Sequence, residues 1–255
     1  MSSFDALTYN TKGLGNKNKR TKVFNYLHGK ITHGFCLLQE THSFSGCEKE
    51  WGKDWGGKIY FSHGTSNSTG VAICFSNNFN WDLIKFSCDE AGRIIILEIK
   101  HNDQKYILIN MYNANSEGDQ LLVLDRLNFL LDNHDCDGDC FPLFGGDFNV
   151  ISDVILDASG GNPSLKKRSL SKILAITERL DVCDIFRVRY PKDKRFTFRQ
   201  KTPLLQRRLD YMFLCNNLQE YVTSIDILPS FMSDHSPVFV KIDTLGNDKR
   251  GSYCW

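Results

Sequence analysis

The sequence of 255 residues lacks the long apolar runs of a membrane protein. No stretch approaches the roughly 18 to 20 consecutive apolar residues that a membrane-spanning helix requires. The N-terminus, MSSFDALTYNTKGLG, also lacks the pattern of a secretory signal, in which an apolar stretch of about 7 to 15 residues follows a basic start. These absences predict a soluble protein that is not secreted and has no membrane partner.

The nine cysteines lack the regular spacing of a disulfide framework, and their number is odd. In a reducing compartment we therefore expect free, buried thiols. The tightest cysteine cluster, HDCDGDC at 134–140, matches the spacing of neither a zinc site nor an EF-hand, so we interpret it as a polar turn.

The chain also lacks low-complexity segments and a clear internal linker. Its length permits one large domain or two small ones, and the missing linker favours one domain over residues 1–243. From Thr244 the sequence TLGNDKRGSYCW is polar and contains glycine. We interpret residues 244–255 as a polar tail or the start of a linker to a following domain.

There is little net charge, only +1, but the charges are unevenly placed. The segment from Lys166 to Leu209 holds 14 Lys or Arg against 4 Asp or Glu. A localised basic surface predicts a polyanionic partner on one side of the molecule. A solvated basic helix and loop is the alternative interpretation.

Short apolar runs rich in β-branched and aromatic residues recur along the chain, and most end at Gly, Asn, Asp or Ser. Helical spacing of apolar residues predicts helices over 19–29, 120–131 and 170–180, with Phe129 and Leu174 among the apolar positions. Many strands with few helices indicate a mixed-sheet α/β layered fold.

Polar residues whose side chains could bind a metal ion or take part in catalysis lie at the ends of these predicted strands. In a sheet with antiparallel pairs, the last residues of some strands and the first residues of others share one edge. We therefore expect convergence of two groups: the strand-ending Asn10, Glu40, Tyr112, Asn115, Asp147 and Asn149, and the strand-starting Asp210, Asp234 and His235.

Converging carboxylates repel one another and raise each other's pKa unless a cation binds between them. The set contains oxygen donors and one imidazole but no cysteine, which favours Mg²⁺, with Mn²⁺ able to substitute, and a phosphate ester as substrate. His235 would act as acid or base near neutral pH, with a carboxylate such as Asp210 accepting its Nδ1 proton. Any of these residues alone is more often structural, so the prediction depends on the whole set.

Six ordered segments resemble the endonuclease/exonuclease/phosphatase superfamily, and they span residues 4–242. The segments are QETH with Glu40, INMYNAN with Tyr112 and Asn115, GGDFN with Asp147 and Asn149, FTF with Thr197, RRLDYM with Asp210, and SDHSPV with Asp234 and His235. The resemblance implies a four-layer α/β sandwich, in which two mixed β-sheets pack face to face with helices outside. It also implies Mg²⁺-dependent cleavage of a phosphoester.

The resemblance further implies roles for individual residues. Glu40 resembles the principal metal ligand of the superfamily, with Asp234 or water nearby. The expected phosphate-positioning donors are Asn10, Tyr112 and Asn149.

Asp147 resembles the group that orients the nucleophile or assists the leaving group, and Asp210 and His235 resemble the coupled pair. Whether Asp147 or His235 manages the nucleophilic water stays open. Many relatives place an acid or amide two residues after the first asparagine, where this chain has Lys12 in NTKG. This departure argues against a metal ligand on that strand, and Lys12 is instead a candidate phosphate contact.

Two branches of the superfamily compete. Abasic-site repair endonucleases usually carry tryptophan between the TF and RLDY motifs, whereas RQKTPLLQRR (199–208) has no aromatic residue and four basic ones. This stretch resembles the minor-groove β-hairpin of the endonuclease domains of LINE-type (non-LTR) retrotransposon polyproteins. We expect DNA contacts from Asn115, Thr197, Arg199, Lys201, Arg207, Arg208, Ser233 and Lys12.

The expected function is therefore Mg²⁺-dependent nicking of one strand of double-stranded target DNA, which leaves a 3′-hydroxyl and a 5′-phosphate. In the family that hydroxyl primes reverse transcription, which predicts a covalently linked downstream reverse transcriptase. The expected site of action is the nucleus, after synthesis in the cytoplasm. The alternatives are an abasic-site repair endonuclease, a phosphatase, and a nucleic-acid-binding domain without catalysis.

Overall fold

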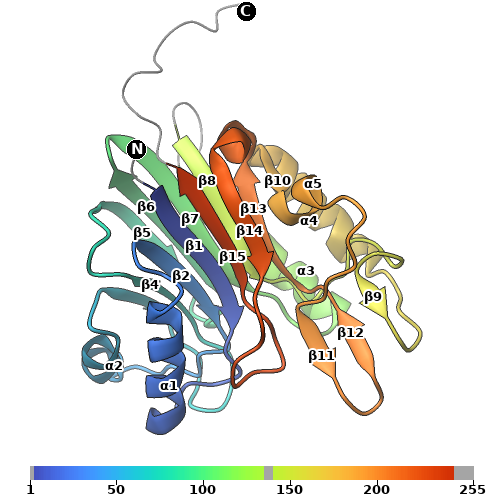
Figure 1. Ribbon diagram of the computed structural model, residues 1–255, viewed down its shortest axis with the longest axis horizontal. Helices are drawn as coiled ribbons and strands as arrows, with labels where there is room; N and C mark the ends of the chain where they lie inside the picture. The colour runs from blue at the N-terminus through green and yellow to red at the C-terminus, as the bar shows by residue number, and fades with distance from the viewer. Residues whose placement is uncertain (1–2, 135–139, 244–255) are drawn as a thin grey trace, which may run out of the picture.

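The computed structural model describes residues 3–134 and 140–243, which form two six-stranded mixed sheets and one small sheet (Figure 1). The centre of the HDCDGDC turn and the predicted tail at 244–255 lie outside the described residues. The first sheet has the order β14 (Val222–Ile227), β15 (Val238–Asp243), β1 (Ser3–Asn10), β2 (Gly34–Gln39), β4 (Val71–Phe75) and β3 (Ile59–Ser62).

The second sheet faces the first. Its order is β10 (Val182–Asp184), β13 (Asp210–Cys215), β8 (Cys140–Asp147), β7 (Gln104–Tyr112), β6 (Ile94–His101) and β5 (Asp82–Cys88). The small sheet has the order β11 (Phe198–Gln200), β12 (Leu205–Arg207) and β9 (Ala158–Ser159).

Helices cover the outer faces of both sheets, so the predicted four-layer sandwich is confirmed. The helices α1 (Lys17–His28) and α2 (Glu48–Trp55) pack on the first sheet, while α3 (Glu117–Leu131) and α4 (Lys167–Arg179) pack on the second. The short α5 (Ile185–Arg189) and the 3₁₀ helix η1 (Asn216–Tyr221) flank β13.

Alternate side chains of β6 lie in two different hydrophobic cores. Ile95 and Leu97 point into the core between the sheets, whereas Ile94 and Ile96 point outward into the core beneath α3 and α4. Strands buried on both faces are continuously apolar, as IIILEI is.

The helices predicted over 19–29, 120–131 and 170–180 correspond to α1, α3 and α4. Side chains of Asn16 and Ser116 accept hydrogen bonds from backbone N–H groups in the first turns of α1 and α3 and so define where these helices start. Two apolar positions of these helices face solvent, because Phe129 is 57% exposed and Leu174 is 55% exposed. Within the described residues, no helix is long and apolar enough to cross a membrane.

Two adjacent glycines in β8 bring this strand close to its surroundings just before Asp147. A Cβ on Gly146 would lie 1.9 Å from the carbonyl oxygen of Met111 in β7, and one on Gly145 would lie 2.6 Å from Leu37 in the facing sheet. The GGD sequence therefore fixes the end of β8 against both β7 and the first sheet.

Candidate active site

Strand register places three of the predicted residues side by side in the second sheet. Tyr112 ends β7 and is paired with Asp147, which ends the parallel neighbour β8. Asp210 begins the antiparallel β13 and is paired with Asp147 from the other side. A parallel and an antiparallel neighbour thus bring two strand ends and one strand start to the same edge.

The first sheet contributes Asn10 and Glu40 to that edge. Asn10 ends β1 beside Gln39, which ends the parallel strand β2, so Glu40 follows directly. The Asn10 amide donates hydrogen bonds to Asp147 Oδ2 at 2.9 Å and to Glu40 Oε1 at 3.3 Å. Asn10 therefore joins the two sheets at the site.

Tyr112 closes this group from the opposite sheet, because its hydroxyl donates to Glu40 Oε1 at 2.5 Å. Burial, and next the negative charge of Glu40, raise the pKa of the Tyr112 hydroxyl well above its usual value. Tyr112 therefore stays protonated and remains a hydrogen-bond donor at neutral pH.

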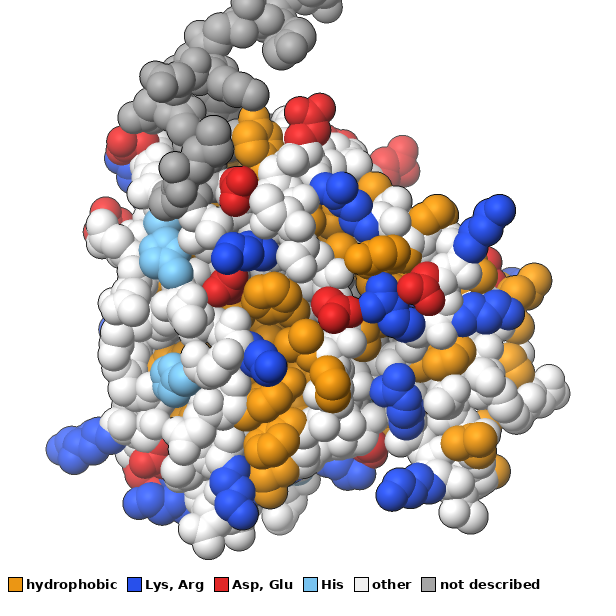
Figure 2. Space-filling view, in the orientation of Figure 1, with side chains coloured by type: hydrophobic (Ala, Val, Ile, Leu, Met, Phe, Trp, Pro, Cys, Tyr) orange, Lys and Arg blue, Asp and Glu red, His pale blue; other side chains and the backbone are white. Residues whose placement is uncertain are grey.

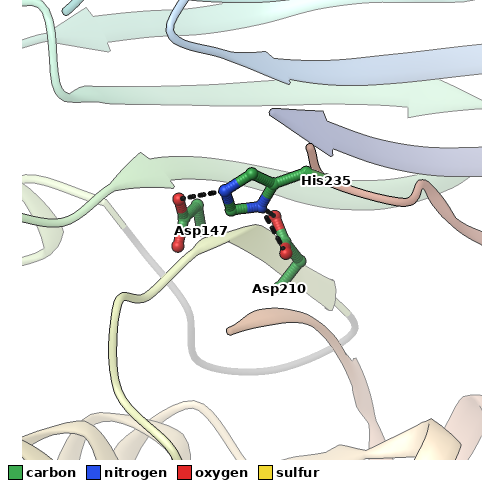
Figure 3. A group of neighbouring side chains, drawn as sticks. All are labelled: Asp147, Asp210 and His235. Atoms are coloured by element: carbon green, nitrogen blue, oxygen red, sulfur yellow. Dashed lines mark hydrogen bonds and ion pairs between the residues drawn. The ribbon is translucent and has the colours of Figure 1, made fainter. Parts of the chain in front are cut away.

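His235 lies between Asp210 and Asp147, and all three residues are buried (Figure 3). Its Nδ1 donates to Asp210 Oδ2 at 2.8 Å, and its Nε2 lies 3.8 Å from Asp147 Oδ2. The carboxylate at Nδ1 holds the imidazole in one orientation and leaves Nε2 facing Asp147.

The two carboxylates determine the charge of His235. Burial by itself lowers the pKa of the imidazole, but Asp210 and Asp147 outweigh burial and raise this pKa to about 10. Burial, and next the repulsion from Asp210, raise the pKa of Asp147 to about 7. At neutral pH the site therefore holds a positively charged imidazole beside a carboxyl group that exchanges its proton readily.

Thr197 and Ser233, which were predicted to contact DNA, instead form hydrogen bonds with backbone groups of the cluster residues or their neighbours. Thr197 is fully buried, and its hydroxyl accepts hydrogen bonds from the backbone N–H groups of Leu209 and Asp210 at 3.0 and 3.1 Å. The predicted DNA contact of Thr197 is therefore wrong, because its side chain fixes the start of β13. The Ser233 hydroxyl, which is half-buried, donates to the Asn10 carbonyl at 2.8 Å and accepts from the His235 N–H at 3.1 Å.

Asn149 adopts a left-handed backbone conformation, with φ of 50°, directly after the GGD turn. Its N–H donates to Asp147 Oδ1 at 3.0 Å, and its side-chain amide donates to the Asn113 carbonyl at 3.0 Å. Asparagine tolerates this conformation better than most residues other than glycine, and the two hydrogen bonds hold it in place here. Asn115 follows two residues after Asn113 and is exposed.

The oxygen-rich donor set at this edge fits a hard divalent cation. Glu40 is only partly buried, and within the described residues its Oε2 accepts no hydrogen bond. The ligand atoms of Asp147, Asp210 and His235 lie within 4.8 Å of one another. Glu40, whose Oε2 has no hydrogen-bond partner among the described residues, is the carboxylate best placed to bind such a cation.

Asp234 was predicted as a second metal ligand, and the structure gives it a different partner. Its Oδ2 binds the Lys12 ammonium at 2.6 Å. Lys12 thus neutralises Asp234 at the position where many relatives have a potential ligand.

The stretch predicted as a hairpin forms β11 and β12, and β9 pairs with β12 (Figure 1). Arg199 and Lys201 are exposed, and Arg199 donates to the Ser236 hydroxyl at 2.9 Å. Arg207 is half-buried and donates to the Ser159 and Gly160 carbonyls at 2.7 and 2.9 Å. Lys and Arg side chains lie over the side of the molecule that carries this hairpin (Figure 2).

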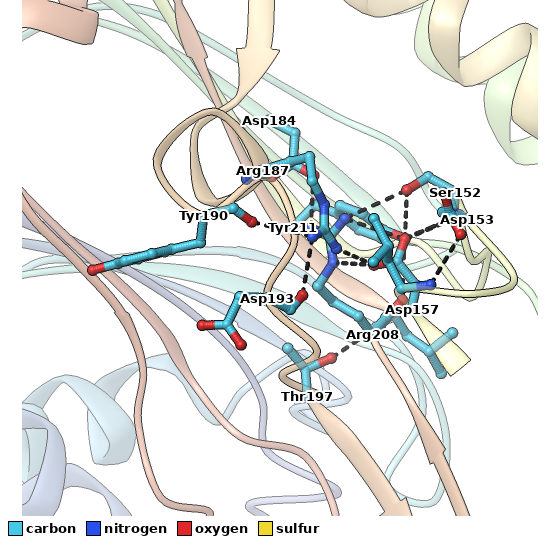
Figure 4. Close-up of polar contacts among 12 residues, drawn as sticks. Ser152, Asp153, Asp157, Asp184, Arg187, Tyr190, Asp193, Thr197, Arg208 and Tyr211 are labelled. Atoms are coloured by element: carbon cyan, nitrogen blue, oxygen red, sulfur yellow. Dashed lines mark hydrogen bonds and ion pairs between the residues drawn. The ribbon is translucent and has the colours of Figure 1, made fainter. Parts of the chain in front are cut away.

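Arg208 was also predicted to contact DNA, and this prediction is wrong, because only 1% of the residue is exposed. Its guanidinium binds Asp157 Oδ1 at 2.7 Å and Asp184 Oδ2 at 2.6 Å (Figure 4). Asp157 also binds Arg187 at 2.7 Å and accepts from the Ser152 hydroxyl at 2.6 Å. Arg208 therefore anchors the base of the hairpin to the loop that carries β9.

Lys166 was not singled out among the predicted site residues, although its ammonium donates to the carbonyls of Asn115 and Asn149 at 2.8 and 2.7 Å. Its sequence context, SLKKRSL, holds three consecutive basic residues. Nothing in that local pattern distinguishes Lys166 from Lys167 or Arg168, which are exposed.

Comparison with known proteins agrees with this geometry. The family model described as Endonuclease/Exonuclease/phosphatase family matches residues 7–235. The chain belongs to this family. It is accordingly an enzyme of the metal-dependent phosphoesterase type.

Relatives come from two branches of the family. A protein of Xenopus laevis, the Transposon TX1 uncharacterized 149 kDa protein, is 25% identical over 96% of this chain. This chain spans only 18% of the length of that relative.

The fold is shared with solved structures of both branches. An AP endonuclease, LMAP from Leishmania major, has a TM-score of 0.72 and 18% identity, over 95% of this chain and 88% of its own. The endonuclease domain of TRAS1, a telomere-specific non-LTR retrotransposon, has a TM-score of 0.66 and 14% identity, over 94% and 98% of the two chains. The predicted family resemblance is thus confirmed.

Proposed function

We propose that the protein is a Mg²⁺-dependent endonuclease that nicks one strand of double-stranded DNA and leaves a 3′-hydroxyl and a 5′-phosphate. The observation that carries the choice of intact DNA is the hairpin beside the catalytic cluster. Residues 199–208 bear exposed Arg199 and Lys201 and contain no aromatic side chain. The one aromatic residue of β11, Phe198, packs against His235 with ring centroids 5.1 Å apart. The similarity to a transposon protein points in the same direction.

In this proposal Glu40 holds the metal ion, which would neutralise the scissile phosphate and stabilise the leaving 3′ oxygen when bound. The raised pKa of Asp147 suits it to take a proton from the attacking water. The water oxygen forms a bond to phosphorus while its proton passes to Asp147, and the bond from phosphorus to the 3′ oxygen breaks. That oxygen takes a proton from solvent water and leaves as the 3′-hydroxyl.

His235 serves as a cation in the same step. Its protonated Nε2 faces Asp147 and would donate to a phosphate oxygen, while Asp210 keeps the imidazole charged and oriented. Asn10, Tyr112 and Asn149 supply further donors at the edge where the phosphate would lie.

The biological setting belongs to the proposal as well. The chain matches 18% of a larger transposon protein. We therefore propose that the nick primes reverse transcription by a covalently linked downstream domain, and that the enzyme acts in the nucleus on double-stranded DNA.

The test compares nicking of intact supercoiled plasmid with incision of a duplex that carries one abasic site, each with Mg²⁺ and with EDTA, followed by end sequencing. We expect Mg²⁺-dependent nicking of the plasmid at a rate comparable to or higher than incision of the abasic duplex. His235→Ala should lose nicking. The control His33→Ala should keep it, because the His33 imidazole bonds the Ser3 carbonyl at the end of β1 opposite Asn10. Much faster cleavage of the abasic duplex would instead support the repair endonuclease that the AP endonuclease neighbours suggest.

A further inference from the structure

A small hollow lies next to the catalytic cluster. It has a volume of about 180 Å³. Several of the residues that line it are close in sequence to Asp147 or Asp210. Asn149 and Val150 come just after Asp147, and Arg207 and Leu209 come just before Asp210. A group bound in this hollow would therefore lie beside whatever occupies the catalytic cluster.

Lys166 lines the hollow, and within the described residues no acid is in direct contact with its charge. Its ammonium is bonded to two carbonyl oxygens, those of Asn115 and Asn149, and no carboxylate lies within 4.0 Å of it among the described residues. An ammonium group has three N–H donors, so one remains for a ligand. Burial lowers the pKa of Lys166, while Asp147 and Glu117 oppose this effect.

Arg207 lines the same hollow and is bonded in the same manner. Its guanidinium donates only to carbonyl oxygens, those of Ser159, Gln206 and Gly160, at 2.7 to 2.9 Å. By contrast, Arg187, Arg195 and Arg208 are paired with aspartates. Arg189 also donates only to carbonyl oxygens, but it lies outside this hollow. Carbonyl oxygens fix the two hollow-lining cations in place without cancelling their charge.

Two fixed and unbalanced cations around one concave site call for an anion, because partly buried charges are normally paired. We propose that this hollow is a second phosphate subsite, which binds the backbone phosphate that flanks the scissile phosphate on the nicked strand. This inference rests on the proposed nuclease function. Asn149 couples the two subsites, since its backbone N–H donates to Asp147 Oδ1 and its carbonyl accepts from Lys166.

A purely structural role for Lys166, as a clamp between the loops that follow β7 and β8, makes a different prediction. Each phosphate contact on duplex DNA contributes about 0.9 to the slope of log affinity against log salt concentration, and a clamp contributes nothing. The salt dependence of DNA binding therefore separates the two roles.

The experiment measures binding to a short duplex over a salt series, with all variants in a His235→Ala background to prevent cutting. We expect Lys166→Met and Arg207→Met each to reduce the slope by about 0.9, Lys166→Arg to restore it, and Lys241→Met to leave it unchanged. Lys241 is exposed on β15, away from this edge.

An unchanged slope in both methionine variants, with wild-type protein that still nicks plasmid, would overturn the subsite and leave the nuclease function standing. Wild-type protein that neither binds nor nicks DNA would overturn the nuclease function itself. Thermal unfolding of each variant identifies any that fail to fold. If Lys166→Met does not fold, Arg207→Met decides the matter, because it removes a charge from the same hollow and leaves the contacts of Lys166 in place.

Discussion

Asp147 and Asp157 are ten residues apart, and both are almost completely buried, with exposures of 1% and 0%. Their surroundings differ in charge balance. Asp147 faces a second carboxylate, Asp210, across one imidazole, whereas Asp157 binds two guanidinium groups and a hydroxyl. The pKa of Asp147 is raised to about 7, and the pKa of Asp157 is lowered.

This comparison separates a reactive site from a structural one. Burial raises the pKa of both groups, but at Asp157 the hydrogen bonds and charge of Arg208 outweigh it. Around Asp147 the excess of negative charge remains. This excess would attract a metal ion, and the bound ion would in turn neutralise the charge of a phosphate group. Five measurements test this difference between the two aspartates.

The largest effect is expected for Asp147→Asn. Loss of the proton acceptor should lower plasmid nicking by about 10²- to 10⁴-fold. Because the variant removes a buried charge that its surroundings disfavour, the melting temperature at pH 8 should stay the same or rise. A large drop in melting temperature would show that Asp147 is structural, like Asp157.

The second prediction concerns the corresponding substitution at Asp157, whose charge is balanced by Arg208 and Arg187. Asp157→Asn leaves Arg208 and Arg187 short of an acceptor and should lower the free energy of unfolding by about 3 to 5 kcal/mol, measured in urea. Nicking by the fraction that remains folded should persist.

The pH dependence provides a check on the cause. A carboxyl group whose pKa is lowered by folding stabilises the folded state above its unfolded pKa of about 3.9, and this contribution is lost as the pH falls through the folded value. The stability difference between wild type and Asp157→Asn should therefore be full at pH 7 and shrink in acid. A difference that does not depend on pH would exclude the charge of Asp157 as its source.

The third prediction concerns the metal. Mg²⁺ at about 100 times its dissociation constant should raise the free energy of unfolding by about 2.7 kcal/mol, because it binds only the folded state. Glu40→Gln should remove this gain, while Glu90→Gln, at an exposed position, should keep it. Equal stabilisation of both variants would place the ion elsewhere.

The smallest effect is expected for Lys12→Ala. The Lys12 and Asp234 side chains are 58% and 30% exposed, so their ion pair should contribute less than about 1 kcal/mol to the free energy of unfolding in urea. A loss as large as that expected for Asp157→Asn would mean that exposure does not explain the difference between the two ion pairs.

Much of the site's position could be predicted from the sequence, because strand ends are marked by local composition. Asn10, Tyr112 and Asp147 close apolar runs, and Asp210 opens one, so the sheet edge follows once the strands pair. Local composition does not show how the strands pair. The four-layer sandwich was predicted from the order of the six family motifs.

The burial of Arg208 could not be predicted in this way. In RQKTPLLQRR it is one of four basic residues, and its partners Asp157 and Asp184 lie 51 and 24 residues away in the chain. Local sequence gives the charge of a side chain, whereas its environment depends on distant segments. The helix α2 was missed for a related reason, since its buried face consists of only Trp51 and Trp55.

The pairing of β1 with β15 has a consequence for biosynthesis. The first strand of the fold is completed by the last, and His235 reaches the site on the segment that leads into β15. During synthesis, Asn10, Glu40 and Asp147 are therefore made well before His235 and the last strand. The cluster can be complete only once the chain has been made through β15, which pairs with β1.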